Sequence, residues 1–143
     1  MRNTATMIDR KAIFTKAPLF GSFAVKDLDA ARQFYGDTLG LDVREDKKTG
    51  IFELHGPDKS HVVVYPKPDH QPANFTVLNL QARNIDEAVD ALTSTGVKFE
   101  RYTTPDMKTD AKGVVRGDNN GPSIAWFRDP SGNIVSVLES QSS

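Results

Sequence analysis

The chain has 143 residues, with 18 basic and 19 acidic side chains and no cysteine, which gives a formal net charge of −1. This length suits one domain with a proper core, and the balanced charge without a basic stripe argues against a nucleic-acid partner. Disulfides and thiolate chemistry are excluded, and no stretch reaches the roughly 18 apolar residues of a membrane span. We therefore expect a soluble, cytoplasmic protein with no membrane partner.

The first half of the chain reads as a strand, a helix and three further strands. Asp27 can cap the helix, because its carboxylate can accept from the free N–H groups of the first turn, and Gly40 can end it in the left-handed conformation. Between them, apolar residues recur at helical spacing. The strands are expected at 19–25, 41–45, 51–55 and 61–65, and a proline-rich linker follows at 66–72.

The same order of elements begins again after the linker. Asn84, about 57 positions after Asp27, can cap a second helix, with Glu87 as the return half of a capping box and Gly96 as the end. Strands are expected at 75–81 and 98–102, followed by a long polar loop at 103–121 and a final hairpin. The repeat predicts an arm and two modules that form one domain, with bounds 1–16, 17–70 and 71–143.

The final hairpin centres on the turn Asp129-Pro130-Ser131-Gly132. Proline presets φ at its position, and glycine accepts the positive φ that closes such a turn. In the strand that follows, alternation separates Ser136 from Val135 and Val137, which face the opposite side. Ser136 is therefore a polar residue in the middle of an apolar strand.

Two motifs carry a family resemblance. They are Val25-x-Asp27-Leu28-Asp29-x-Ala31-x-x-Phe34-Tyr35-x-x-x-Leu39-Gly40-Leu41 and Phe127-x-Asp129-Pro130-x-Gly132-Asn133. Together they resemble the vicinal oxygen chelate superfamily, which includes glyoxalase I, bleomycin-resistance proteins and extradiol dioxygenases. The resemblance covers residues from about 17 to 140 and rests on helix, cap and turn residues. It implies an α+β fold of two βαβββ modules in tandem, whose curved mixed sheets enclose a cleft, and it implies a homodimer.

Enzymes of this superfamily usually hold a divalent metal with four His, Gln or Glu side chains on the first and last strand of each module. The resemblance places these positions at Phe20, Val63, Val77 and Ser136. Phenylalanine and valine carry no donor atom, and a serine hydroxyl alone does not hold a transition metal. We therefore expect no metal and no cofactor at this site.

Alternate residues on the same strands predict the walls of the cleft. A mostly apolar cleft with a few polar groups is typical of a small-molecule pocket, although the same residues can also fill a closed core. Trp126, the only tryptophan, can stack on a flat ligand or lie in a core or a dimer interface. The predicted ligand pocket consists of Phe20, Ser22, Val63, Tyr65, Val77, Asn79, Trp126 and Ser136.

No catalytic set is evident in the sequence. Tyr65 and His61 are the candidates for acid–base chemistry, while a solvated strand end is the simpler interpretation of His61. Arg116 in the long loop and Lys67 in the linker can pair with an anionic ligand or be solvated.

These observations favour a metal-independent binding protein that sequesters or senses a small apolar or aromatic molecule. The alternative is a glyoxalase-like lyase or isomerase that uses acid–base residues or an atypical metal site around His61. A third possibility is an interaction module whose cleft has closed, which a cleft volume below roughly 300 Å³ would indicate.

Overall fold

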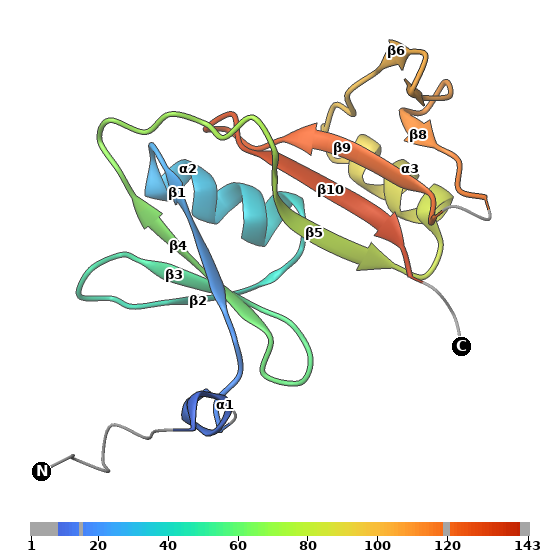
Figure 1. The fold of residues 1–143 in the computed structure, drawn as a ribbon. Helices are drawn as coiled ribbons and strands as arrows, with labels where there is room; N and C mark the ends of the chain where they lie inside the picture. Colours follow the sequence, from blue (N-terminus) through green and yellow to red (C-terminus); the bar gives the residue numbers. More distant parts are fainter. Residues whose placement is uncertain (1–8, 15, 119–120, 141–143) are drawn as a thin grey trace, which may run out of the picture.

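The computed structural model describes residues 9–14, 16–118 and 121–140, so residues 1–8 and 15 of the predicted arm and 119–120 of the predicted loop lie outside the described residues. Two four-stranded sheets form the framework of the fold (Figure 1). Sheet A contains β1 (Gly21–Val25), β2 (Asp42–Glu45), β3 (Phe52–His55) and β4 (His61–Pro66). Sheet B contains β5 (Thr76–Ala82), β8 (Val114–Val115), β9 (Ile124–Arg128) and β10 (Ile134–Glu139).

The two sheets share one topology. Their strand orders are β1-β4-β3-β2 and β5-β10-β9-β8. β1 runs parallel to β4 in sheet A, and β5 runs parallel to β10 in sheet B. The other neighbouring strands are antiparallel. The α+β fold built from a repeated unit is therefore confirmed. The linker runs from 67 to 75, and the expected module boundary between 70 and 71 falls within it.

The helices begin and end where local chemistry predicts. Asp27 accepts from the Ala30 N–H and Asn84 from the Glu87 N–H, while Gly40 and Gly96 have positive φ. The described helical elements are α1 (Arg10–Ile13), α2 (Leu28–Gln33) with its continuation as the π-helical turn η2 (Phe34–Thr38), and α3 (Ile85–Ser94). None of the helices in this part of the chain is both long and apolar enough to cross a membrane.

Three local expectations are wrong. Among the described residues the Glu87 carboxylate makes no return bond to the Asn84 N–H, and the neighbouring N–H of Ile85 donates to Glu139 Oε2 at 3.0 Å. Residues 98–102 make only one bridge, Phe99 with Phe127, so the strand that flanks β9 is β8. The stretch 103–121 also contains a small hairpin, β6 (Thr103–Thr104) with β7 (Met107–Lys108), and is not wholly irregular.

One core serves both modules. The helices cover one face of each sheet, and α3 lies against β10 (Figure 1). Phe34 packs on Phe127, with ring centroids 5.9 Å apart, and so joins the helix of the first module to sheet B. The largest fully buried apolar side chains are Tyr35, Phe52, Phe127, Ile85, Val25, Val64, Val89, Val114 and Val135.

A buried carboxylate joins the modules at the turn between β9 and β10. Asp129 is 5% exposed, and its Oδ1 accepts from the backbone N–H groups of Ser131 and Asn133 at 2.8 and 2.9 Å. Its Oδ2 accepts from the Tyr35 hydroxyl at 2.7 Å and from Asn133 Nδ2 at 3.0 Å. Asn133 Nδ2 also donates to the Ala24 carbonyl, and the Lys26 N–H donates to Ser131 Oγ. The turn at 129–132 therefore binds β1, the residue after it and the helix of the other module.

Replacing Asp129 by asparagine tests this joint. The amide nitrogen would face two donors, the Tyr35 hydroxyl and Asn133 Nδ2, where the carboxylate accepts from both. We expect Asp129→Asn to lower the free energy of unfolding by about 2 kcal/mol in urea titrations. Asp106→Asn, at an exposed loop position, is the control and should change stability by less than about 0.5 kcal/mol.

The hydrogen bond between Tyr35 and Asp129 also predicts that the stability of the protein falls at alkaline pH. Burial, and next the Asp129 carboxylate, raise the pKa of the Tyr35 hydroxyl far above its usual value of 10.0. Above about pH 10 the unfolded chain releases this proton and the folded chain keeps it, so stability falls as pH rises. Between pH 9 and pH 11, Tyr35→Phe should therefore lose less stability than the wild-type protein. An equal loss in both proteins, measured by urea titration, would contradict this assignment.

Candidate ligand-binding site

The predicted site residues of the first module lie on the face of sheet A that points away from the core. Ser22 of β1 pairs with Val63 of β4, and Tyr65 follows two residues later on the same face. Ser22 and Tyr65 are exposed, whereas Phe23 and Val64 on the opposite face are buried. Alternation along these strands is therefore as expected.

Phe20 precedes β1 and stacks on His61. The two rings lie 4.7 Å apart at 20°, and His61 stacks in turn on His55 at 5.4 Å and 15°. His61 Nδ1 lies 3.1 Å from the Lys59 carbonyl, and His55 Nε2 lies 2.6 Å from Glu53 Oε1. His61 is therefore a partly exposed residue at the start of β4 that also belongs to an aromatic stack.

The site residues of the second module form a polar pair and an aromatic neighbour on sheet B. Ser136 lies opposite Asn79 on one side and Trp126 on the other, and its hydroxyl donates to Asn79 Oδ1 at 2.5 Å. Trp126 Nε1 donates to Thr76 Oγ1 at 3.1 Å. A register shift in β5 at Val77 breaks the expected alternation, so Thr76 and not Val77 shares the face of Ser136.

Two hollows contain residues from both sheets. The first, the inter-sheet groove, has a volume of about 600 Å³ and contains Phe20, His61 and Asn79 from the predicted set. Most of its remaining wall is apolar, from Leu19, Leu41, Leu54, Val62, Leu78 and Leu80. The sequence assigned Leu78 and Leu80 to packing alone. They lie half-buried against the core and also line the groove.

The second hollow lies beneath the linker between the modules. This linker hollow has a volume of about 490 Å³ and contains Ser22, Tyr65 and Val77 from the predicted set. Its other lining residues are Phe23, Ala24, Lys67, Asp69, His70, Gln71, Ala73, Phe75, Thr76 and Asn133. Val63, Trp126 and Ser136 line neither hollow. The predicted pocket residues therefore lie in two hollows, on sheet A (Val63) and on sheet B (Trp126 and Ser136).

The two candidate acid–base residues are separated by this arrangement. His61 lines the inter-sheet groove, and Tyr65, 36% exposed, lines the linker hollow. A substrate in either hollow would therefore meet only one of them.

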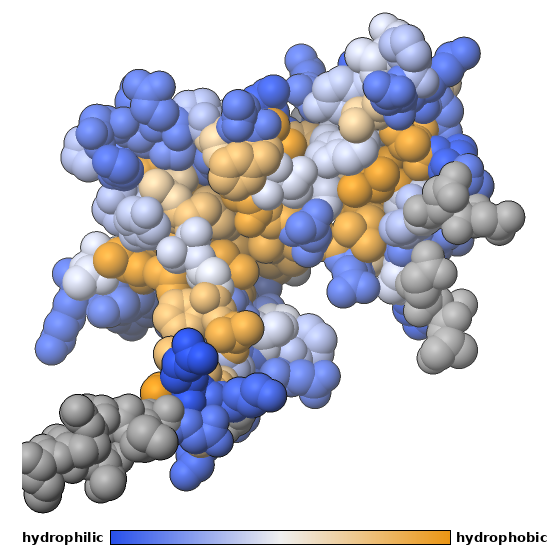
Figure 2. Space-filling model, viewed as in Figure 1, coloured by the Kyte–Doolittle hydropathy of each residue, from blue (hydrophilic) through white to orange (hydrophobic). Residues whose placement is uncertain are grey.

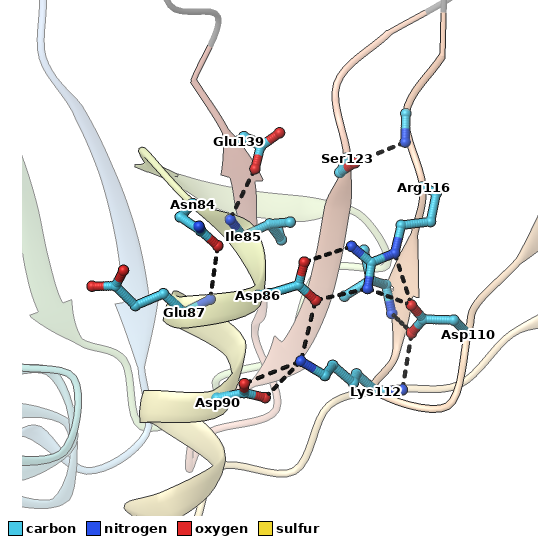
Figure 3. Close-up of polar contacts among 12 residues, drawn as sticks. Asn84, Ile85, Asp86, Glu87, Asp90, Asp110, Lys112, Arg116, Ser123 and Glu139 are labelled. Atoms are coloured by element: carbon cyan, nitrogen blue, oxygen red, sulfur yellow. Dashed lines mark hydrogen bonds and ion pairs between the residues drawn. The ribbon is translucent and has the colours of Figure 1, made fainter.

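Arg116, a candidate partner for an anionic ligand, is engaged by carboxylates of the chain (Figure 3). Its two Nη atoms donate to Asp86 at 2.8 and 2.7 Å, and its Nε donates to Asp110 at 2.9 Å. Lys112 binds Asp86 and Asp90 at 3.2 and 3.0 Å. Hydrogen bonds from Arg116 and Lys112 hold the pKa of Asp86 well below its usual value. The network anchors the 103–118 segment to the start of α3.

Lys67, the other candidate, forms an ion pair with Asp69 at 2.7 Å. The sequence did not reveal the Asp86 partner of Arg116, because the two residues are 30 positions apart and meet only through the fold.

The family model for the glyoxalase/bleomycin resistance protein/dioxygenase superfamily matches residues 19–137. The chain therefore belongs to this superfamily, as the two motifs predicted. No curated protein matches it.

Many crystal structures have the same fold. A protein from Bacillus anthracis described as of the glyoxalase family has a TM-score of 0.68 and 18% identity, with 99% of this chain and 100% of that chain covered. TnmS3, an antibiotic binding protein from Streptomyces sp. CB03234, has a TM-score of 0.61 and 21% identity, over 89% and 99% of the two chains. A superfamily member from Sphaerobacter thermophilus has a TM-score of 0.61 and 25% identity, over 87% and 98%.

The positions at which the resemblance places metal ligands do not fit a metal ion. Phe20, Val63 and Val77 carry no donor atom, and the Ser136 hydroxyl is engaged by Asn79. Within residues 9–14, 16–118 and 121–140, no three His, Asp or Glu side chains are grouped to hold a metal ion. The side chains at these four positions therefore do not form a metal-binding site.

The anchoring of the 103–118 segment yields a prediction. Arg116→Met should speed amide hydrogen exchange at Val114 and Val115, because the ion pairs that hold the end of β8 to Asp86 of α3 and to Asp110 are lost. Salt at 1 M should have a similar effect on the wild-type protein, since the pairs are exposed. Arg101→Met, at another exposed arginine, is the matched control. Unchanged exchange in Arg116→Met would show that packing alone holds β8.

Proposed function

We propose that this chain is a metal-independent binding protein for a small apolar or aromatic molecule, held in the inter-sheet groove. The groove volume of about 600 Å³ carries the proposal. It lies within the range of about 300–1,000 Å³ that is usual for small-molecule sites and exceeds the limit for a closed cleft. The walls are mainly aliphatic, and Phe20 offers a flat ring on which an aromatic ligand would stack.

Two further observations support binding over catalysis. The ligand positions of the metalloenzymes hold side chains that do not bind metal, and His61 and Tyr65 line different hollows. The antibiotic binding protein TnmS3 has the same fold, so the fold is compatible with such a role. The alternative, a glyoxalase-like lyase or isomerase, would have to use His61 or Tyr65 singly, or an atypical metal site around His61.

We also propose that the chain is a cytoplasmic homodimer. Ile13, Phe14, Leu19 and Phe20 are between 52% and 90% exposed and follow one another closely in the chain. Figure 2 shows hydrophobic residues gathered along β1 and between the sheets, with hydrophilic residues around them. A second copy would cover such a surface, because clustered exposed apolar side chains mark interaction sites.

The groove is tested by ligand binding. Protein purified under native conditions is examined by native mass spectrometry for a co-purified molecule, and binding of a library of aromatic compounds is measured by saturation-transfer difference NMR. Phe20→Ala should weaken binding about tenfold through loss of the stacking surface. Phe75→Ala, which removes an exposed ring outside the groove, is the matched control.

Two outcomes would contradict the groove assignment. The first is the absence of any co-purified molecule together with no response across the library. The second is a stoichiometric transition metal in the purified protein with turnover that requires it, which would support the lyase or isomerase.

The dimer is tested by sedimentation. Phe14→Asp adds a charge to the exposed apolar surface and should shift the protein to the monomer, because burying an unpaired carboxylate is costly. Lys47→Asp, in the exposed turn of sheet A, should leave the dimer intact. A wild-type protein that sediments as a monomer at 100 μM would refute the proposal.

A further inference from the structure

Asn79 lines the inter-sheet groove with a side-chain amide that is held in one orientation. Ser136, its partner in the register of β5 with β10, is fully buried. The Ser136 hydroxyl donates to Asn79 Oδ1 at 2.5 Å. The carbonyl end of the Asn79 amide therefore points to β10, and the NH2 group is the end that points away from Ser136.

The surroundings of Ser136 explain this orientation. Trp126, its neighbour on the other side, has a side-chain donor and no acceptor, and that donor is bound to Thr76 Oγ1. A flipped amide would turn the Asn79 oxygen away and take this acceptor from the Ser136 hydroxyl. Because buried hydroxyl groups are nearly always hydrogen-bonded, the amide keeps its oxygen toward Ser136.

The NH2 end of this amide is the end that a ligand can reach. Asn79 is exposed and lines the groove, although its partner Ser136 is buried. An amide NH2 group donates hydrogen bonds and accepts none. At this position the groove therefore favours a ligand that carries a hydrogen-bond acceptor.

Gln81 has the same kind of side chain without the same constraint. It lies two residues further along β5, on the same side of the strand, and also lines the groove. Its partner in the register with β10 is Leu138, whose side chain has no polar atom. The Gln81 amide can therefore present either its oxygen or its nitrogen, and we expect it to discriminate little between acceptors and donors.

We propose that Asn79 determines the specificity of the inter-sheet groove, and that the groove binds a planar aromatic molecule whose edge carries an acceptor, either a ring nitrogen or a carbonyl oxygen. The acceptor accepts from Asn79 Nδ2, and the ring packs on Phe20, which is 59% exposed. Ser136 is the positioning residue of the amide. The inference rests on the proposed function, because it names the class of ligand for the same groove.

The test compares three bicyclic probes of similar size on the full-length protein at neutral pH, where all three are uncharged. Quinoline has an acceptor nitrogen, indole has an N–H donor, and naphthalene has neither. Dissociation constants are measured by NMR titration of ¹⁵N-labelled protein, in which the side-chain NH2 resonances of Asn79 report contact directly. We expect quinoline to shift these resonances.

Asn79→Asp should reverse the preference between the probes. The carboxylate still accepts from Ser136, while its second oxygen replaces the donor by an acceptor. The ratio of the quinoline to the indole dissociation constant should therefore rise about tenfold over its wild-type value. The same two probes are compared in each protein, so their different hydration cancels. Ser136→Ala, which frees the amide to turn, should move the ratio part of the way in the same direction.

Three controls locate the effect. Gln81→Glu makes the same change of amide to carboxylate in the same groove and should alter the ratio by less than about threefold. Phe20→Ala should weaken all three probes without changing the ratio. Phe75→Ala, outside the groove, should weaken none.

Naphthalene separates this inference from the proposed function. If naphthalene binding depends on Phe20 while Asn79→Asp leaves the ratio unchanged, the groove binds ligands and the role of Asn79 is overturned. Quinoline binding that leaves the Asn79 NH2 resonances unshifted, or that depends on Phe75 and not on Phe20, also overturns it. No binding of any probe up to its solubility limit would contradict both claims. The wild-type titration decides the matter even where a substituted chain fails to fold.

Discussion

A buried carboxylate joins the two halves of this molecule. Asp129 lies in a turn of the second module, yet one of its oxygens accepts from Tyr35 in the helix of the first. Taking a carboxylate out of water is costly unless each lone pair finds a donor, and here four hydrogen bonds supply the donors. Because one of these donors, the Tyr35 hydroxyl, belongs to the first module, the halves cannot separate without breaking this hydrogen bond and exposing the carboxylate. The turn thus sets the relative placement of the sheets.

Both hollows depend on that placement. The inter-sheet groove lies between sheet A and β5, and the linker hollow is bordered by Asn133 of the joint itself. The caps, helix ends and turns that mark the superfamily all serve the scaffold, while the positions of its metal ligands hold phenylalanine, valine and serine. The chain thus has the structural motifs of the superfamily without side chains that coordinate a metal. For this reason we infer ligand binding and not metal-assisted catalysis.

Local features could be predicted from the sequence, whereas features set by distant partners could not. The caps Asp27 and Asn84 and the turn at 129–132 depend on neighbours within four residues, and they form as expected. The register shift at Val77 arises in the pairing of β5 with β10. The strand that pairs with β9 is β8, at 114–115, whereas the stretch 98–102 makes a single bridge to β9. The hollows lie between modules, so alternation within one strand identified only some of their lining residues.

The most direct test of this account is a double-mutant cycle on the joint, with Tyr35→Phe, Asp129→Ala and the double variant compared by urea unfolding. The account predicts that the two substitutions are not additive. The double variant should be more stable than the sum of the single losses implies, by roughly 1–2 kcal/mol, because the hydrogen bond is lost only once. Additive losses within about 0.3 kcal/mol would contradict the claim that this contact couples the two modules.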